Sequence, residues 1–255
     1  MNGKRLKEKL QAGERVFGFF VVSMSYPTVV EVLPDGVDFV VCTTEHNALD
    51  LADFVPLQYA LRPRGIACLA RVHSHDPWDI ARVCDTYDGV VVPYVEDVLQ
   101  VRRMVAAAKC RTLKGEALEH WVQTGDFPSD ATRDYIAGRN ANAVFAPMIE
   151  SPRSVENLDA ICAIPGIDAV FVGPNDMTVS MGIPEERDHP DFIAIMQRII
   201  DIAAQHGVAA GCHFHKLEHS QRMIAQGARF IPYGSDHQFI GEGVRGMLKA
   251  LRGQG

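Results

Sequence analysis

Two apolar runs in the middle of the chain decide the fold: VFAPMIE at residues 144–150, and AVFV at 169–172, which opens into GPND at 173–176. Both are continuously apolar rather than alternating, which is typical of parallel strands that are covered on both faces. Each run leads to an acid, Glu150 or Asp176, at the point where a buried strand should reach open space. One strand-helix-strand unit separates the two acids, so a parallel sheet would bring them to the same edge.

Six further apolar runs of this kind occur along the chain, each followed by a segment with helical spacing. The predicted strands are residues 16–23, 38–43, 66–71, 89–95, 144–150, 169–173, 208–213 and 230–233. The predicted helices are residues 26–33, 51–61, 76–87, 98–108, 155–163, 190–205 and 220–225. Eight such units predict an α/β fold, a single-domain (β/α)8 TIM barrel spanning residues 1–255, with a doubly wound sheet as the alternative.

The regular spacing fails once, in a long polar stretch at about 110–139. Asp130 can cap a helix that begins near Ala131. We expect this stretch to be an insertion at the catalytic rim, acting as a lid or a substrate-specific loop rather than as a separate domain.

Composition narrows the class of protein. The 25 Lys and Arg against 32 Asp and Glu give a net charge of -7, well mixed along the chain, which argues against nucleic-acid binding. The six cysteines are scattered, as expected of core residues in a reducing compartment. Neither a signal peptide nor a membrane span is recognisable, so we expect a cytoplasmic protein with no membrane partner.

The polar residues at the predicted strand ends form a chemically coherent set. They are Thr43 to Asn47, Arg71 to His73, Pro93 to Glu96, Glu150, Asp176, and Gly234 to Asp236. Two carboxylates with water suit Mg²⁺ or Mn²⁺, and a 2-oxo acid could chelate such an ion. Arg71 would add a positive charge at the substrate oxygens. His46 could take a proton from a substrate hydroxyl, because its ordinary pKa lies near neutrality.

Each of these residues also has a plainer interpretation. Glu150 or Asp176 alone would more often be an acid in the first turn of a helix. His46 alone is more often a surface histidine, and Arg71 alone is more often half of a structural ion pair. The two acids together at adjacent strand ends favour the metal site. Asp236 is expected to fix a loop.

In this order the residues resemble the HpcH/HpaI aldolase family, the metal-dependent class II pyruvate aldolases. Three blocks carry the resemblance: DFVVCTTEH at 38–46, ARV at 70–72, and Glu150 with PGIDAVFVGPNDMTVSMG at 165–182. The resemblance implies that Glu150 and Asp176 hold the metal, that Arg71 steadies the oxo acid, and that His46 is the base. It further implies that backbone amides around Gly173, Pro174 and Asn175 hold the pyruvate carboxylate.

The resemblance also implies a TIM barrel with exchanged C-terminal helices, assembled from dimers into a homo-oligomeric hexamer, and Co²⁺ as a further metal option. Two positions depart from the family pattern. Thr43 stands where the family has an aspartate that orients the histidine, so Thr43 and Glu45 are expected to support His46 differently. Met148 replaces a glutamine near the substrate.

The reaction predicted first is the cleavage of a 4-hydroxy-2-oxo acid to pyruvate and an aldehyde, or the reverse condensation, through a metal-bound enolate. Thr43 and Met148 motivate a second hypothesis, a biosynthetic condensation or decarboxylation of an oxo acid such as oxaloacetate at the same site. The third hypothesis is a barrel that has lost catalysis and serves as a binding subunit. The four retained site residues count against it.

Overall fold

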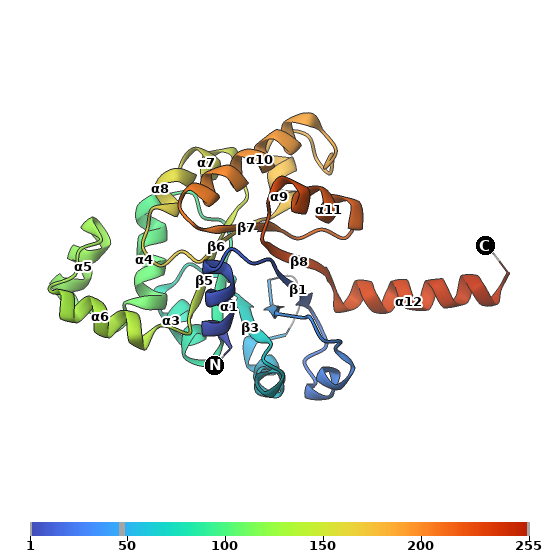
Figure 1. Cartoon of the computed structure of the whole chain (residues 1–255), viewed down its shortest axis with the longest axis horizontal. Helices are drawn as coiled ribbons and strands as arrows, with labels where there is room; N and C mark the ends of the chain where they lie inside the picture. The colour runs from blue at the N-terminus through green and yellow to red at the C-terminus, as the bar shows by residue number, and fades with distance from the viewer. Residues whose placement is uncertain (1, 46–48, 254–255) are drawn as a thin grey trace.

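A computed structural model describes residues 2–45 and 49–253. It contains a closed barrel of eight parallel strands in chain order, in which β8 pairs with β1 (Figure 1). The strands are β1 (Val16–Val21), β2 (Phe39–Thr43), β3 (Ala67–Arg71), β4 (Gly89–Val92), β5 (Val144–Ile149), β6 (Ala169–Val172), β7 (Ala209–Cys212) and β8 (Phe230–Ser235). All eight predicted strands are confirmed, and the architecture is a (β/α)8 TIM barrel.

Helices surround the barrel. They are α1 (Gly3–Gln11), α2 (Val55–Leu61), α3 (Pro77–Thr86), α4 (Val98–Lys109), α5 (Gly115–Thr124), α6 (Asp130–Arg139), α7 (Pro152–Glu156), α8 (Leu158–Cys162), α9 (Pro174–Ser180), α10 (Pro190–Gln205), α11 (Leu217–Gln226) and α12 (Asp236–Leu251). Short 3₁₀ helices are η1 (Pro27–Val32), η2 (Leu51–Phe54) and η3 (Arg62–Arg64). The helix predicted at 26–33 is therefore 3₁₀, and α1, α5, α9 and α12 were not predicted.

Side chains alternate between the inside and the outside of the barrel along each strand, as the two-residue period of a strand requires. On β2, Phe39 and Val41 pack in the cluster that fills the barrel interior, whereas Val40 and Cys42 pack under the surrounding helices. This alternation is what places every second residue of a strand towards the barrel axis. The last inward position of each strand then faces the open carboxyl end.

Helix α1 closes the opposite end of the barrel. Leu6 and Leu10 on this helix join the interior cluster, and Lys9 Nζ lies 2.6 Å from Asp38 Oδ1, just before β2. The amino ends of the strands are therefore covered, and only their carboxyl ends remain for a site.

The stretch at 110–139 does not lie where the sequence suggested. It follows α4 and precedes β5, so it is an αβ connection, whereas the catalytic rim is made of βα connections. Its two ends meet at the closed end of the barrel: Asn140 Nδ2 donates to the carbonyl of Lys109, and the Lys109 ammonium pairs with Asp168, just before β6. A lid at the active-site rim is therefore not what this insertion forms.

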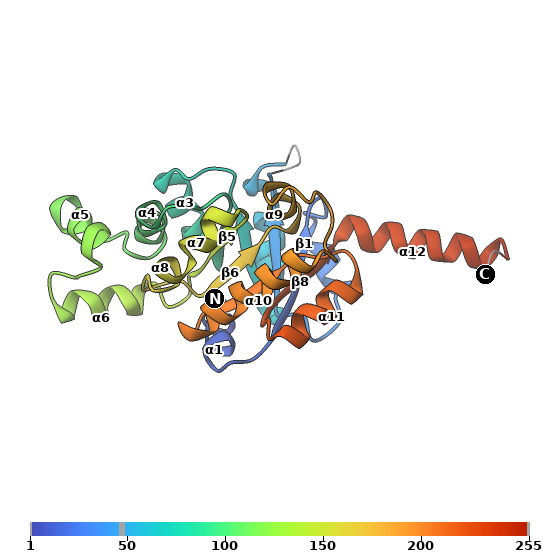
Figure 2. The ribbon, with the colours of Figure 1, turned by 90° about the horizontal axis from the view of Figure 1, so that it is seen from above.

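The insertion folds into α5 and α6, which lie beside the barrel next to α4 (Figures 1 and 2). Ser129, not Asp130, caps α6, because the Ser129 side chain accepts from the Thr132 N–H. Trp121 and Ile136 belong to the same buried apolar cluster as the outer side chains of the barrel strands. That shared core is in keeping with the expected single domain.

Helix α12 leaves the barrel and extends away from it (Figures 1 and 2). Asp236 at its first turn is buried and accepts from the backbone N–H groups of Val22, Ser23 and Met24 at 2.7–3.1 Å, so it fixes the loop after β1. Among the described residues, no helix is long and apolar enough to cross a membrane. The cytoplasmic location stays a prediction.

Candidate active site

The last inward-facing positions of β2, β3, β5 and β6 bring polar and small residues together at the open end of the barrel. Each lies two residues beyond an interior side chain, namely Val41, Leu69, Met148 and Phe171. These positions hold Thr43, Arg71, Glu150 and Gly173. Thr43 and Arg71 are direct partners across β2 and β3, and the register of β5 and β6 pairs the residues just before Glu150 and Gly173.

The carboxylate of Glu150 is the centre of this arrangement. Its Oε2 accepts a hydrogen bond from the backbone N–H of Tyr94 at 2.8 Å, and Glu150 is only 6% exposed. Burial raises the pKa of Glu150 to about 7, and the nearby Asp176 and Glu45 carboxylates raise it as well, while the Tyr94 N–H and Arg71 oppose them. Three carboxylates close to a single arginine leave an excess of negative charge.

Asp176 reaches the site from the first turn of α9, which follows β6 directly. The helix begins with Pro174 after Gly173, so the turn is tight and the acid stays close to the strand end. Position 173 must be glycine because the Glu150 carboxylate lies against it. A Cβ at this position would lie 2.2 Å from Oε1 of Glu150, so only glycine leaves the carboxylate its place.

Arg71 is held by two acceptors. Its Nε donates to Thr43 Oγ1 at 2.8 Å and lies 2.9 Å from Glu45 Oε2, and its side chain is 12% exposed. The guanidinium also lies over the Phe20 ring, 5.3 Å from its centroid. Burial lowers the pKa of Arg71, while Glu45 and Glu150 raise it. Both polar contacts are made by Nε, and they fix the orientation of the guanidinium.

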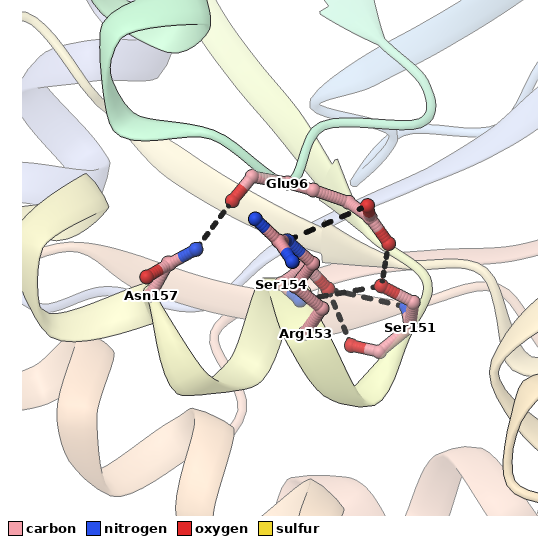
Figure 3. A network of polar contacts seen from close by, with 5 residues as sticks. All are labelled: Glu96, Ser151, Arg153, Ser154 and Asn157. Atoms are coloured by element: carbon pink, nitrogen blue, oxygen red, sulfur yellow. Dashed lines mark hydrogen bonds and ion pairs between the residues drawn. The ribbon is translucent and has the colours of Figure 1, made fainter.

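The turn that follows Glu150 is tied to the loop after β4 (Figure 3). The Ser151 hydroxyl donates to the Glu96 carboxylate, and Asn157 Nδ2 donates to the Glu96 carbonyl at 2.7 Å. Ser151 and Ser154 cap α7 reciprocally. These bonds hold the backbone on both sides of the Glu150–Tyr94 contact.

A cavity of about 350 Å³ opens beside these residues. Its lining includes Thr43, Arg71, Met148, Gly173, Pro174, Asn175 and Asp176, together with Arg187, His213, His215, Lys216 and His219. The Arg187 guanidinium donates to Asn175 Oδ1. The structure thus brings the predicted site residues together. It does not test His46, which lies outside the described residues.

The basic and histidine side chains that line the cavity were not predicted as site residues, although His213 follows β7 directly and could have been found as a strand-end residue. The centroids of the His213 and Phe20 rings lie 4.5 Å apart. The His213 Nε2–H donates to the Gly234 carbonyl at 3.0 Å. Burial, followed by the proximity of His215, lowers the pKa of His213 to about 3. His213 is therefore neutral at physiological pH.

The donor set fits a hard divalent cation. Glu150 and Asp176 present oxygen ligands beside a region of excess negative charge, which a cation would relieve. Within residues 2–45 and 49–253, no group of three or more His, Cys, Asp or Glu side chains is placed to hold a metal. Two carboxylates completed by water and substrate match the way Mg²⁺ is commonly bound.

The family model of the HpcH/HpaI aldolase/citrate lyase family matches residues 16–241, and the chain belongs to this family. It is therefore an enzyme, a carbon–carbon lyase of the aldolase type. The chain is 32% identical over 218 residues to the 5-keto-4-deoxy-D-glucarate aldolases of Shigella dysenteriae and Escherichia coli, which covers 84% of this chain and 84% of each relative.

Solved structures agree with the fold and the family. An HpcH/HpaI aldolase/citrate lyase family protein from Burkholderia cenocepacia is 26% identical, with a TM-score of 0.82 over 98% of this chain and 99% of the other. The citrate synthase SbnG is also 26% identical, with a TM-score of 0.78 over 98% of both chains.

Proposed function

We propose that this aldolase cleaves a 4-hydroxy-2-oxo acid to pyruvate and an aldehyde, and catalyses the reverse condensation, with Glu150 and Asp176 holding a divalent cation. The single observation that carries this proposal is that the buried Glu150 carboxylate, with Asp176 close by, meets the fixed Arg71 guanidinium at the open end of the barrel. Mg²⁺ or Mn²⁺, and Co²⁺ as a further option, would polarise the substrate ketone and neutralise the charge that develops on its oxygen.

The residues of the chain supply binding and orientation. Arg71 would bind oxygens of the oxo acid through the edge of its guanidinium that Thr43 and Glu45 leave open, and its charge stabilises the pyruvate enolate. Backbone N–H groups around Gly173 to Asn175 would hold the pyruvate carboxylate, as the family resemblance implies. His46 would take the proton of the 4-hydroxyl group, with Thr43 and Glu45 supporting its loop.

We propose a dicarboxylate of the sugar-acid class, such as 5-keto-4-deoxy-D-glucarate, as the substrate. Lys216 lines the same cavity and would pair with the carboxylate at the aldehyde end. Replacing Lys216 with Ala should lower kcat/KM for condensation with an acidic aldehyde about tenfold or more, and leave condensation with glycolaldehyde unchanged. Equal losses with both aldehydes would remove this assignment.

Pyruvate enolisation tests the proposed site directly. Wild-type protein with Mn²⁺ should exchange the methyl protons of pyruvate with solvent deuterium, and Glu150→Gln should abolish the exchange. An unchanged rate in this variant would show that Glu150 is not part of the site.

The likeness to SbnG supports a second candidate, the condensation of an oxo acid such as oxaloacetate with an acetyl donor. Met148 in the cavity is the observation that favours it, because a methionine offers no polar contact to an aldehyde hydroxyl. Turnover of oxaloacetate with acetyl-CoA, without turnover of pyruvate and aldehydes, would establish this candidate.

We further propose a homo-oligomer built by exchange of α12. This helix carries a stripe of exposed apolar side chains, including Phe239, Val244 and Met247, which are 40%, 47% and 54% exposed. A helix of 16 residues with so little packing is marginal in water on its own. The barrel also carries an apolar cavity of about 540 Å³, lined by residues such as Phe17, Val29 and Leu33.

The occupant we assign to this cavity is α12 of a second copy, because the helix and the cavity adjoin at β8 and share apolar character. Val244→Asp should convert the assembly to a monomer in sedimentation velocity, whereas Lys249→Ala should leave it intact. A monomeric wild type would remove the proposal. The hexamer implied by the resemblance stays a prediction.

A further inference from the structure

The loop of residues 181–189 joins α9 to α10, so it is part of the connection that leads from β6 to the next outer helix. Connections of this kind form the open end of the barrel, where Glu150 and Asp176 lie. Asp176 is on the first turn of α9, a helix of only seven residues. Because so short a helix is barely stable on its own, its position depends on contacts from outside it.

The loop makes such contacts with α9. The Thr178 hydroxyl, buried on α9, donates to the Asn175 carbonyl at 2.9 Å and accepts from the Glu185 N–H at 3.2 Å. The Arg187 guanidinium donates to Asn175 Oδ1. Asn175 directly precedes Asp176 in the same turn. The bond from Arg187 therefore reaches the neighbour of the proposed metal ligand.

Arg187 is itself held by α11. Arg222 on this helix donates through Nη2 to the Arg187 carbonyl at 2.7 Å and through Nη1 to Asp188 Oδ1 at 2.8 Å. The His219 Nε2 lies 3.3 Å from the Asp188 carboxylate, and the His219 side chain is only 8% exposed. The backbone of the loop is thus tied to α11, while the Arg187 side chain extends to α9 and borders the cavity.

We propose that Arg187 is a positioning residue that holds the first turn of α9, and with it Asp176, in place for a divalent cation. The role rests on the proposed function, in which Glu150 and Asp176 bind that cation. Without the guanidinium, Asn175 loses its bond to a loop that α11 holds, and the first turn of α9 becomes more mobile. Binding of the cation must then order this turn, which weakens the measured affinity.

The test compares Arg187→Ala with wild type and with Arg198→Ala, a matched loss of an exposed arginine on α10. Mn²⁺ binding to each metal-free protein is measured by calorimetry. A hydrogen bond from a charged donor supports an expected rise in the Mn²⁺ Kd of about threefold to tenfold for Arg187→Ala. Arg198→Ala should bind Mn²⁺ as the wild type does. Equal Mn²⁺ Kd values for the two variants would overturn the proposal.

Kinetics separate positioning from direct binding of the substrate. At saturating Mn²⁺, kcat for deuterium exchange into pyruvate should stay within about twofold of wild type in Arg187→Ala, because the bound cation itself orders the turn. If Arg187 instead bound the substrate, the variant would keep the wild-type Mn²⁺ Kd and would lose activity with acidic aldehydes alone. That result would contradict the positioning role.

Amide hydrogen exchange in the metal-free proteins reports on the turn without any reaction. Exchange in peptides that cover residues 174–180 should be about threefold to tenfold faster in Arg187→Ala than in wild type. The same peptides should be unchanged in Arg198→Ala. If the wild type binds no Mn²⁺, the proposed function fails, while the exchange comparison still decides whether Arg187 holds the turn.

A double-mutant cycle with Asn175→Ala tests the contact itself. If Arg187 acts through Asn175, the double variant should have a Mn²⁺ Kd no higher than Arg187→Ala alone, and additive losses would contradict the coupling. Arg187→Met, which keeps the apolar stem and removes the donors, is a second variant in case Arg187→Ala folds poorly. It should show the same rise in the Mn²⁺ Kd, and a wild-type value would equally overturn the proposal.

Discussion

Replacing Gly173 with alanine should disable the site without breaking the fold. The backbone of Gly173 has φ -84° and ψ 100°, which alanine adopts without strain. The added Cβ would lie 2.2 Å from Glu150 Oε1, whereas real Cβ contacts are essentially never under 3.0 Å, so the carboxylate would have to move by at least about 0.8 Å (3.0 minus 2.2). Displacement of a reacting group by about 1 Å can lower a rate about 100-fold, so we expect a loss of roughly 30-fold to 100-fold.

The assay is the rate of deuterium exchange into the pyruvate methyl group, followed by proton NMR with saturating Mn²⁺, together with Mn²⁺ affinity by calorimetry. Gly138→Ala is the matched control. An added Cβ at Gly138, on α6, meets nothing within 4 Å, so this variant should behave as wild type. The reasoning is refuted if Gly173→Ala folds normally, as judged by circular dichroism, and keeps wild-type exchange and Mn²⁺ affinity.

Three further predictions concern groups around the site. Thr43→Val removes the hydroxyl that accepts from Arg71 Nε, and KM for pyruvate should rise about threefold to tenfold in the exchange assay, with an unchanged KM counting against the contact. His213 has a pKa lowered to about 3 from 6.5, so its protonation favours the unfolded state as the pH falls below 6.5. In urea titrations, wild type should lose about 2 kcal/mol more stability than His213→Phe between pH 7.5 and 5, and parallel losses would contradict a buried neutral histidine. Asp236→Ala should lower the free energy of unfolding by about 2–4 kcal/mol, because three partly buried backbone N–H groups lose their acceptor, and a change below about 1 kcal/mol would refute that role.

The strands could be predicted because their signal is local. A strand covered on both faces must be apolar throughout, and β2, β4, β5, β6 and β7 are buried at every position. Helix α12 was not predicted. Its apolar stripe is exposed in the single chain, so the amphipathic pattern could not be matched to a strand that the helix would cover. The insertion was predicted at the wrong end of the barrel. It follows α4, which ends at Lys109, so it connects a helix to the next strand, whereas the connections at the catalytic rim run from a strand to a helix.

The closeness of Glu150 and Asp176 could be predicted from the sequence. Parallel strands all end at the same rim of the barrel, so the prediction required only that the ends of the two strands be located correctly. The two-residue alternation that continues from Leu69 to Arg71 and from Met148 to Glu150 is also readable from the sequence once the interior residues are known. Tyr94 could not be assigned a role. Its backbone N–H donates to Glu150 from a residue with positive φ, and neither the bond nor the conformation leaves a local signal in the sequence.

The central claim is that Glu150 and Asp176 together hold a divalent cation to which an oxo acid can bind. A crystal of the protein soaked with Mn²⁺ and oxalate, a stable mimic of the pyruvate enolate, tests it most directly through anomalous scattering at the manganese edge. One strong peak is expected within about 2.3 Å of a carboxylate oxygen of each acid, with oxalate beside Arg71. A manganese peak elsewhere, or oxalate bound without either carboxylate as a ligand, would contradict it.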